Sequence, residues 1–231
     1  MSARSLLLIR HGQASFGAKD YDRLSPVGEE QSRLLGSWLT ACASLPDLIA
    51  IGPRQRHRRT AELCLEAAGI EADLLTLDGL DELDHAEVLA RHRPELSGAG
   101  ALRAELKKSS DPHRAFQQLF ADAVARWTSG SHDAEYSCSW TQFRANTLAA
   151  LQVLTGHSAR TIWAFTSGGP IAVIANALLD APHAQAFRLS WPLVNTSITQ
   201  LRPGSRGATL ITYNTWPHLQ PAAHHHLVTL R

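Results

Sequence analysis

The stretch Leu6–Gln13 reads Leu-Leu-Leu-Ile-Arg-His-Gly-Gln and decides how the rest of the chain is interpreted. The apolar run Ser5–Ile9 is short and bounded by polar residues, as expected of a strand buried on both faces of a sheet. A histidine beside an arginine then follows at the strand end. Neutral imidazole can attack phosphorus, a guanidinium can hold two phosphate oxygens, and glycine lets the backbone come close. The stretch therefore predicts a strand that leads into a site for phosphoryl chemistry.

Further along the chain, short apolar runs alternate with helical patterns. Ser25-Pro26 offers an N-cap followed by proline at the first helical position, and Gly69 is suited to end a helix. Strands are predicted at 47–51, 73–77 and 161–165, helices at 56–68, 144–154 and 171–179, and a closing hairpin of strands 196–201 and 209–213 around Pro203-Gly204. This alternation predicts an α/β fold with a mostly parallel central sheet and helices on both faces.

Residues 84–139 differ in composition from the rest of the chain. They are polar and charged, and Pro94, Gly98, Gly100 and Pro112 interrupt them. We expect a mostly helical insertion or cap there, carried by a single domain that spans residues 1–231. A chain of 231 residues is long enough for one such domain.

The composition is that of a soluble globular protein. Hydrophobic residues make up 44% and charged residues 19%, and the formal net charge is +1. A balance so close to neutral argues against nucleic acid as a partner, and no apolar run is long enough to span a membrane. Cys42, Cys64 and Cys138 are few and widely spaced, as in a reducing compartment. We expect a cytoplasmic protein that contacts neither nucleic acid nor membrane.

Three other predicted strand ends carry residues suited to a phosphate site. Gly52–Thr60 is a basic turn that opens a helix and contains Arg56, and Ser167-Gly168 is a turn of small residues at another helix start. Asp81-Glu82 supplies a carboxyl group. Because ligands bind at the carboxyl ends of the strands in open α/β sheets, these groups are expected to converge on a phosphomonoester.

Several motifs in the same order resemble the histidine phosphatase superfamily, which includes phosphoglycerate mutases and many small phosphatases. The motifs are Leu8–Gln13, Leu24–Gln31, and Gly52–Arg56 with Thr60-Ala61, to which Asn214 and His218-Leu219 add a similar ending. Gly52 stands where the family usually has serine. The resemblance covers most of the chain outside 84–139 and implies a phosphoglycerate mutase-like fold.

The resemblance also implies a role for each matching residue. His11 is expected to be the catalytic nucleophile, and Glu82 the catalytic proton donor. Arg10, Arg56, Ser167 and Gly168 are expected to bind the phosphoryl group. No metal and no cofactor are implied. The run His224-His225-His226 has no carboxylate or cysteine nearby at ligand spacing, and we interpret it as exposed or packed against its neighbours.

Two departures from the family pattern stand out. The family usually has a second histidine before the glycines at 168 and 169, and this chain has Ser167. A serine donates one neutral hydrogen bond and cannot replace an imidazolium, so activity is expected to be weakened. His57 and His85 lie near site residues in the sequence and are candidates to supply the missing imidazole. The second departure follows Glu82, where the family's usual segment is absent.

Three functions follow from these patterns. The first is a phosphatase that hydrolyses a small phosphomonoester through a phosphohistidine on His11, with phosphate as product or inhibitor. The second is a pseudoenzyme that binds a phosphorylated ligand with little or no turnover. A phosphoglycerate mutase ranks last, because it requires a long-lived phosphohistidine, which a phosphate site without the second histidine does not favour.

Overall fold

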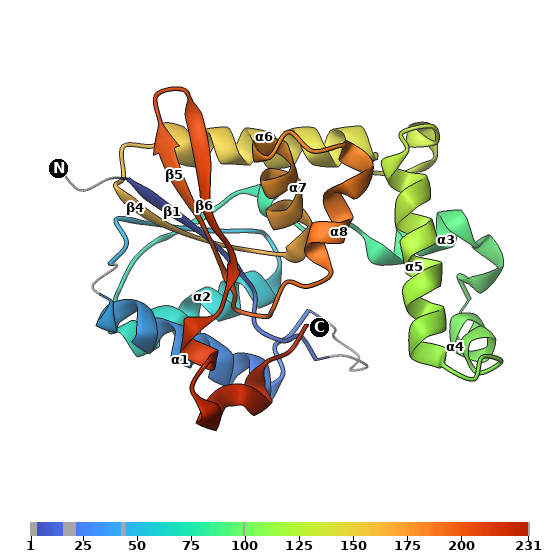
Figure 1. Cartoon of the computed structure of the whole chain (residues 1–231), viewed down its shortest axis with the longest axis horizontal. Helices are drawn as coiled ribbons and strands as arrows, with labels where there is room; N and C mark the ends of the chain where they lie inside the picture. Colours follow the sequence, from blue (N-terminus) through green and yellow to red (C-terminus); the bar gives the residue numbers. More distant parts are fainter. Residues whose placement is uncertain (1–3, 16–21, 43–44, 99, 231) are drawn as a thin grey trace. The chain divides into compact units, whose positions relative to one another are not determined.

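The computed structural model describes residues 4–15, 22–42, 45–98 and 100–230. The chain divides into two compact units, one formed by residues 1–82 and 146–231 and the other by residues 83–145. The first unit contains a six-stranded sheet in the order β3-β2-β4-β1-β5-β6 (Figure 1). Its strands are β1 (Ser5–Arg10), β2 (Leu48–Ile51), β3 (Leu74–Thr76), β4 (Thr161–Thr166), β5 (Ile198–Gly204) and β6 (Gly207–Thr215).

The sheet is mostly parallel, as the sequence predicts. Strands β3, β2, β4 and β1 pair in parallel, whereas β5 pairs antiparallel with both β1 and β6. One detail of the prediction is wrong, because Pro203-Gly204 does not form the hairpin turn. Both residues belong to β5 and pair with Ala208 and Gly207. The pairing between β1 and β5 ends at Leu201. Pro203 lies beyond it, so the missing N–H of this proline breaks no hydrogen bond to β1.

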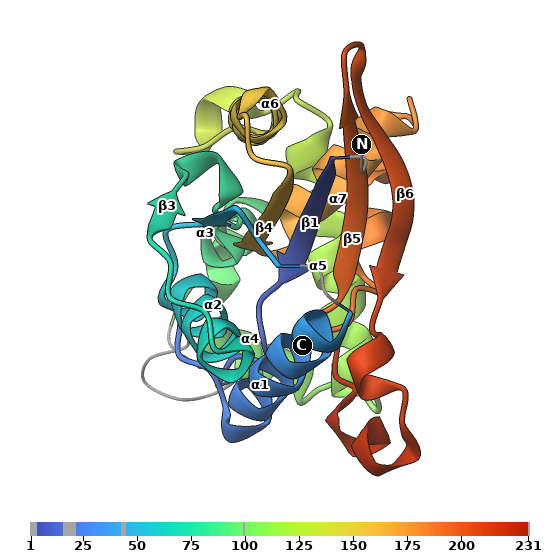
Figure 2. The ribbon, with the colours of Figure 1, turned by 90° about the vertical axis from the view of Figure 1, so that its left-hand side faces the viewer.

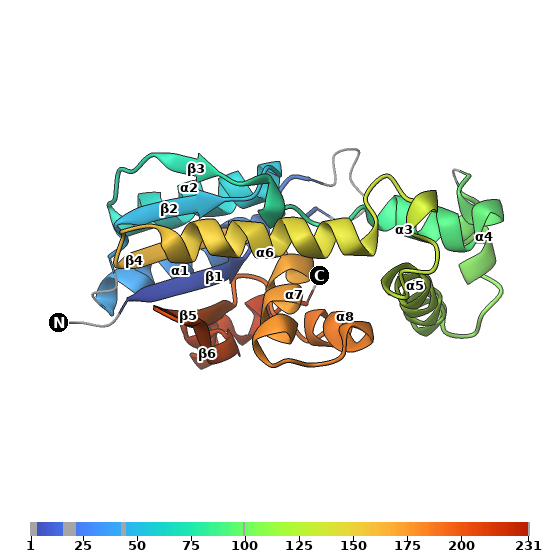
Figure 3. The same cartoon turned by 90° about the horizontal axis from the view of Figure 1, so that it is seen from above.

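Helices cover both faces of the sheet. On one face lie α1 (Pro26–Ala41) and α2 (Gln55–Ala68), and on the other lie α6 (Trp140–Gly156) and α7 (Gly168–Leu178), with α8 (Ala186–Ser190) beside α7 (Figure 2). Figure 3 shows α6 nearest the viewer, with the strands and then α1 and α2 behind it. Ser25 caps α1 through a bond from the Gly28 amide at 3.1 Å, and Gly69 ends α2 with a φ of 67°.

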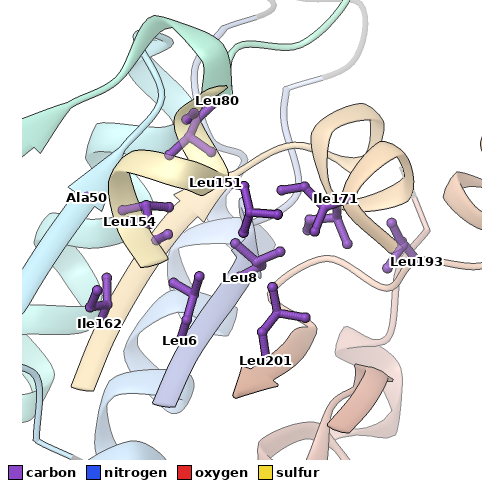
Figure 4. Packing of buried hydrophobic residues seen from close by; sticks show 13 residues of the cluster. Leu6, Leu8, Ala50, Leu80, Leu151, Leu154, Ile162, Ile171, Leu193 and Leu201 are labelled. Carbon is purple, nitrogen blue, oxygen red and sulfur yellow. The ribbon is translucent and has the colours of Figure 1, made fainter. Parts of the chain in front are cut away.

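Two hydrophobic clusters hold these layers together. Leu6 and Leu8 of β1 point to α6 and α7, where they meet Leu151 and Ile171 (Figure 4). Leu7 and Ile9 of β1 belong to the cluster beneath α1 and α2. This strict alternation of faces buries Leu6–Ile9 and fixes which way the residues after Ile9 must turn.

The second unit consists of helices. They are α3 (His85–His92), α4 (Ala101–Leu106) and α5 (Pro112–Thr128), and the first residues of α6 also belong to this unit. Trp127 packs against Trp140 and Phe143, with 5.4 Å between the ring centres in each pair. Across the described ranges of both units, we find no helix both long and apolar enough to cross a membrane.

Candidate active site

The four strand ends singled out in the sequence meet at one edge of the sheet. The backbone amide of His11 donates to the Thr166 carbonyl at 2.9 Å, and that of Gly52 donates to the Phe165 carbonyl at 2.9 Å. The Thr166 hydroxyl donates to the Leu80 carbonyl at 2.6 Å, just before Asp81-Glu82. These bonds link the chain after β1, β2 and β4 with the turn that follows β3.

His11 is buried and held in one orientation. Its Nδ1 lies 2.7 Å from the carbonyl oxygen of Gly12. Because a carbonyl can only accept, Nδ1 carries the hydrogen in that bond. In neutral imidazole the other nitrogen, Nε2, then keeps its lone pair. The backbone is fixed as well, since Asn195 Nδ2 donates to the His11 carbonyl at 3.1 Å.

The surroundings of His11 favour its neutral form. Burial is the largest cause of a pKa held well below the usual value for histidine, and the positive charges of Arg56 and Arg10 lower the pKa further. His57 adds a smaller effect in the same direction, and the bond to Gly12 opposes it. His11 is therefore uncharged at neutral pH and retains the lone pair that a nucleophile needs.

Gly12 makes the turn after His11 possible. A Cβ at this position would lie 2.5 Å from the carbonyl oxygen of Gly28 in α1, closer than atoms approach in proteins. The Gly12 amide donates to Thr60 Oγ1 at 3.0 Å, and the Thr60 hydroxyl donates to the carbonyl of Arg56 at 2.7 Å. The Arg-His-Gly turn is thus wedged between α1 and the first turns of α2.

The two arginines are held by different partners. The Arg10 guanidinium donates to the carbonyl oxygens of Leu193 and Leu230. Arg56 is almost fully buried, and its guanidinium donates to a carboxylate oxygen of Asp22 at 2.8 Å. The other oxygen of Asp22 accepts from the amide of Gln55, the first residue of α2, at 2.7 Å. This corner already accommodates a carboxylate, as expected where a helix N-terminus adjoins an arginine.

The side chain of Glu82 contacts the first turn of α7. One of its carboxylate oxygens accepts from the Gly169 amide at 3.2 Å. Arg54 holds the turn that carries Glu82, since it pairs with Asp81 at 2.5 Å and donates to the Glu82 carbonyl at 3.0 Å. The sequence placed Arg54 in a basic cluster but gave no signal that it anchors Glu82. Gly168, the first residue of α7, is buried and directly precedes Gly169.

Ser167 does not stand alone at the end of β4. Its hydroxyl oxygen lies 2.7 Å from Nε2 of His57, and the rings of His57 and His11 are 5.8 Å apart between centres. Of the two histidines considered as replacements, His57 therefore lies at the site. His85 belongs to the second unit, where its ring packs edge-on against Phe120 at 5.3 Å.

Metal ligation has no support in the part of the chain that the structure describes. No group of three or more histidine, cysteine, aspartate or glutamate residues there could hold a metal ion. In the His224–His226 run, a ring nitrogen of His224 lies 3.1 Å from the carbonyl of His218, and one of His225 lies 2.6 Å from that of Gln220. Both rings therefore donate to the main chain.

Comparisons with known proteins agree on one family. The model of the histidine phosphatase superfamily (branch 1) matches residues 6–215. A 2,3-bisphosphoglycerate-dependent phosphoglycerate mutase from Thermobifida fusca (strain YX) is 37% identical in an alignment over 73 residues, and the match covers 29% of this chain and 29% of that relative. The match thus spans less than a third of the relative's length.

Solved structures of low identity share the fold over nearly the whole chain. The phosphoglycerate mutase from Bacillus anthracis str. Sterne has a TM-score of 0.65 at 14% identity, covering 94% of this chain and 95% of that one. A mutant phosphoserine phosphatase from Entamoeba histolytica, in complex with phosphoserine, has a TM-score of 0.58 at 18% identity, with coverage of 93% and 98%. These likenesses establish the phosphoglycerate mutase-like fold.

Proposed function

Because the chain belongs to the histidine phosphatase superfamily, we propose that it is a phosphatase that hydrolyses a small phosphomonoester through a phosphohistidine on His11. The observation that carries the proposal is the state of His11. Its Nδ1 hydrogen is engaged by Gly12, its pKa is lowered mainly by burial, and Nε2 is left as the nucleophilic atom. His57 is also buried beside two arginines, but its Nε2 lies 2.7 Å from Ser167 Oγ and is therefore engaged.

In the first step, Nε2 of His11 attacks the phosphorus atom of the substrate. The bond between phosphorus and nitrogen forms as the bond to the ester oxygen breaks, and Glu82 gives its proton to the departing alkoxide. Arg10 and Arg56 stabilise the negative charge on the phosphoryl oxygens. The Gly168 amide, at the N-terminus of α7, offers a further donor.

In the second step, Glu82 acts as a base. Its carboxylate takes a proton from water as the water oxygen attacks the phosphorus atom, and the bond to Nε2 breaks. Inorganic phosphate leaves, Nε2 regains its lone pair, and Glu82 is protonated for the next turnover. Phosphate is therefore expected to inhibit, because this product binds to the same site as the phosphoryl group of the substrate.

A small phosphorylated molecule is the proposed substrate. The carboxylate of Asp22 on Arg56 and on the start of α2 supports the view that this corner favours anions. The related Entamoeba histolytica phosphatase was solved with phosphoserine, a ligand of the size that we propose.

Steady-state hydrolysis of p-nitrophenyl phosphate tests the proposal. The protein should release phosphate, His11→Ala should not, and His226→Ala, which removes an exposed histidine, should match the unchanged protein. Equal rates for the unchanged protein and His11→Ala would overturn the proposal. Vanadate binding without hydrolysis would select the pseudoenzyme instead, the alternative that Ser167 favours.

A further inference from the structure

Thr196 holds an uncommon backbone conformation opposite the end of β1. Its φ is 60°, in the left-handed region that β-branched residues rarely adopt, and the residue is 0% exposed. It lies two residues before β5, which pairs antiparallel with β1. Such a conformation persists only where the surrounding bonds fix it, and residues of this kind cluster at functional sites.

The main-chain amide of Thr196 contacts the turn that carries the proposed nucleophile. It donates to the carbonyl oxygens of Arg10 and His11, at 3.1 and 3.3 Å. The Gly12 amide lies in the same peptide group as the His11 carbonyl and donates to Thr60 Oγ1 at 3.0 Å. Hydrogen bonds therefore hold both ends of the peptide group that follows His11.

The Thr196 hydroxyl fixes the peptide group to which the Thr196 amide belongs. It donates to the carbonyl oxygen of Asn195 at 2.6 Å. That carbonyl and the Thr196 amide are the two ends of one planar peptide group. A rotation of the plane that carried the amide away from His11 would also break the bond to the hydroxyl. The side chain of Thr196 thus controls where its own amide points.

His218 holds the same hydroxyl from the other side. Its Nε2 lies 2.8 Å from Thr196 Oγ1. Because the hydroxyl hydrogen is used on the Asn195 carbonyl, Nε2 carries the hydrogen of this second bond. Burial lowers the pKa of His218 to about 3, so the ring is neutral and has one N–H group. Within the described ranges its Nδ1 is buried without a hydrogen-bond partner, as a bare lone pair would be.

We propose that Thr196 and His218 position the nucleophile His11. The His218 N–H group holds the Thr196 hydroxyl, the hydroxyl fixes the peptide group before it, and the amide of that group holds the His11 main chain. Both are positioning residues, because they act through the main chain. With that chain held, the Gly12 carbonyl stays against Nδ1 and Nε2 keeps one orientation for attack. This inference rests on the proposed function, which makes His11 the nucleophile.

Removing the Thr196 hydroxyl while keeping the side-chain shape tests the proposal. We expect Thr196→Val to lower kcat on p-nitrophenyl phosphate about 10- to 100-fold, because a misplaced nucleophile reacts slowly. Thr196→Ser keeps the hydroxyl and should retain kcat to within about threefold. Inhibition by inorganic phosphate should be unchanged in both variants, since the guanidinium groups of Arg10 and Arg56 have partners of their own. Thr209→Val, at an exposed position in β6, is the matched control and should not change kcat.

A double-mutant cycle tests whether His218 acts through Thr196. His218→Phe keeps a buried ring and removes the N–H group, and we expect it to lower kcat about tenfold. Added to Thr196→Val it should cost no further kcat, since groups that act as a unit are not additive. Losses that multiply in the double variant would overturn the proposal. So would a kcat of Thr196→Val equal to that of the unchanged protein, or an equal loss in Thr196→Ser and Thr196→Val.

Nitrogen NMR spectra of isotope-labelled histidine decide the proposal even without hydrolysis. Equal hydrolysis by the unchanged protein and His11→Ala would refute the proposed function alone. At neutral pH the unchanged protein should show His218 with its hydrogen on Nε2. The His11 signals should shift in Thr196→Val and stay in place in Thr196→Ser. A hydrogen on Nδ1 of His218, which needs no variant to detect, or unshifted His11 signals in Thr196→Val would overturn the proposal.

Discussion

Lowering the pH should destabilise this protein through its buried neutral histidines. His218 is the clearest case, because burial first, and then the charge of His224, lower its pKa to about 3 from the usual 6.5. Below about pH 6.5 the unfolded chain binds a proton at this residue that the folded chain does not. The free energy of unfolding must therefore fall as the pH falls. The stabilisation is complete above about pH 6.5 and is lost progressively as the pH approaches about 3.

The size of the effect follows from these two pKa values. A histidine that titrates near 6.5 when unfolded and near 3 when folded loses about 2 kcal/mol of stabilisation between about pH 7 and pH 5. The pKa of His11 and that of His57 are lowered as well, so both add losses of the same sign. With a total stability of about 5–15 kcal/mol, typical of a folded protein, the combined loss is large.

Urea unfolding at pH 7, 6 and 5 measures this loss. His218→Asn keeps a polar group beside Thr196, whose hydroxyl lies 2.8 Å from the His218 ring, and removes the titration. We expect this variant to lose about 2 kcal/mol less than the unchanged protein over the range. His226→Ala, at an exposed position, should follow the unchanged protein. Identical pH dependence in His218→Asn and the unchanged protein would refute the reasoning.

Other predictions concern the acid and its supports. Glu82→Gln should lower kcat/KM about 10²- to 10⁴-fold on an alkyl phosphate and much less on p-nitrophenyl phosphate, whose leaving group needs no proton; equal losses would contradict the acid role. Arg54→Gln removes the anchor of the Glu82 turn and should lower kcat on the alkyl phosphate about 10- to 100-fold, and an unchanged kcat would show that the anchor is dispensable. Gly12→Ala should cost about 1–3 kcal/mol of unfolding free energy in urea, because its Cβ meets a main-chain oxygen of α1 at 2.5 Å, whereas Gly156→Ala, in open space, should cost nothing.

The sheet and the approximate placement of the site were predictable from local pattern. Apolar runs with turn residues at their ends placed the strands, and the chemistry after Ile9 indicated which end mattered. The hairpin turn was misplaced because proline and glycine usually interrupt a strand. Here β5 continues beyond the last residue that pairs with β1. Pro203 lies in this continuation, where its missing N–H breaks no hydrogen bond to β1.

The contact between His57 and Ser167 was beyond the reach of pattern. The two residues are 110 positions apart, and only the parallel pairing of β2 with β4 brings them together. His57 was a candidate because it follows Arg56, but His85 was an equal one on the same grounds. Asp22 belongs to no motif, and Arg54 lies within the Gly52–Arg56 motif without a role of its own. The roles of both emerge only from the bonds that they make to Arg56 and to the Glu82 turn.

A trapped phosphoenzyme tests the central claim most directly. Glu82→Gln given p-nitrophenyl phosphate should be phosphorylated, since this leaving group needs no acid, and then stall because no base activates water. Quenching in base, proteolysis and mass spectrometry should find one phosphoryl group on His11, accompanied by a single-turnover burst of p-nitrophenol. Continued release of p-nitrophenol with no phosphoryl group on His11, or a phosphoryl group on another residue, would contradict the account.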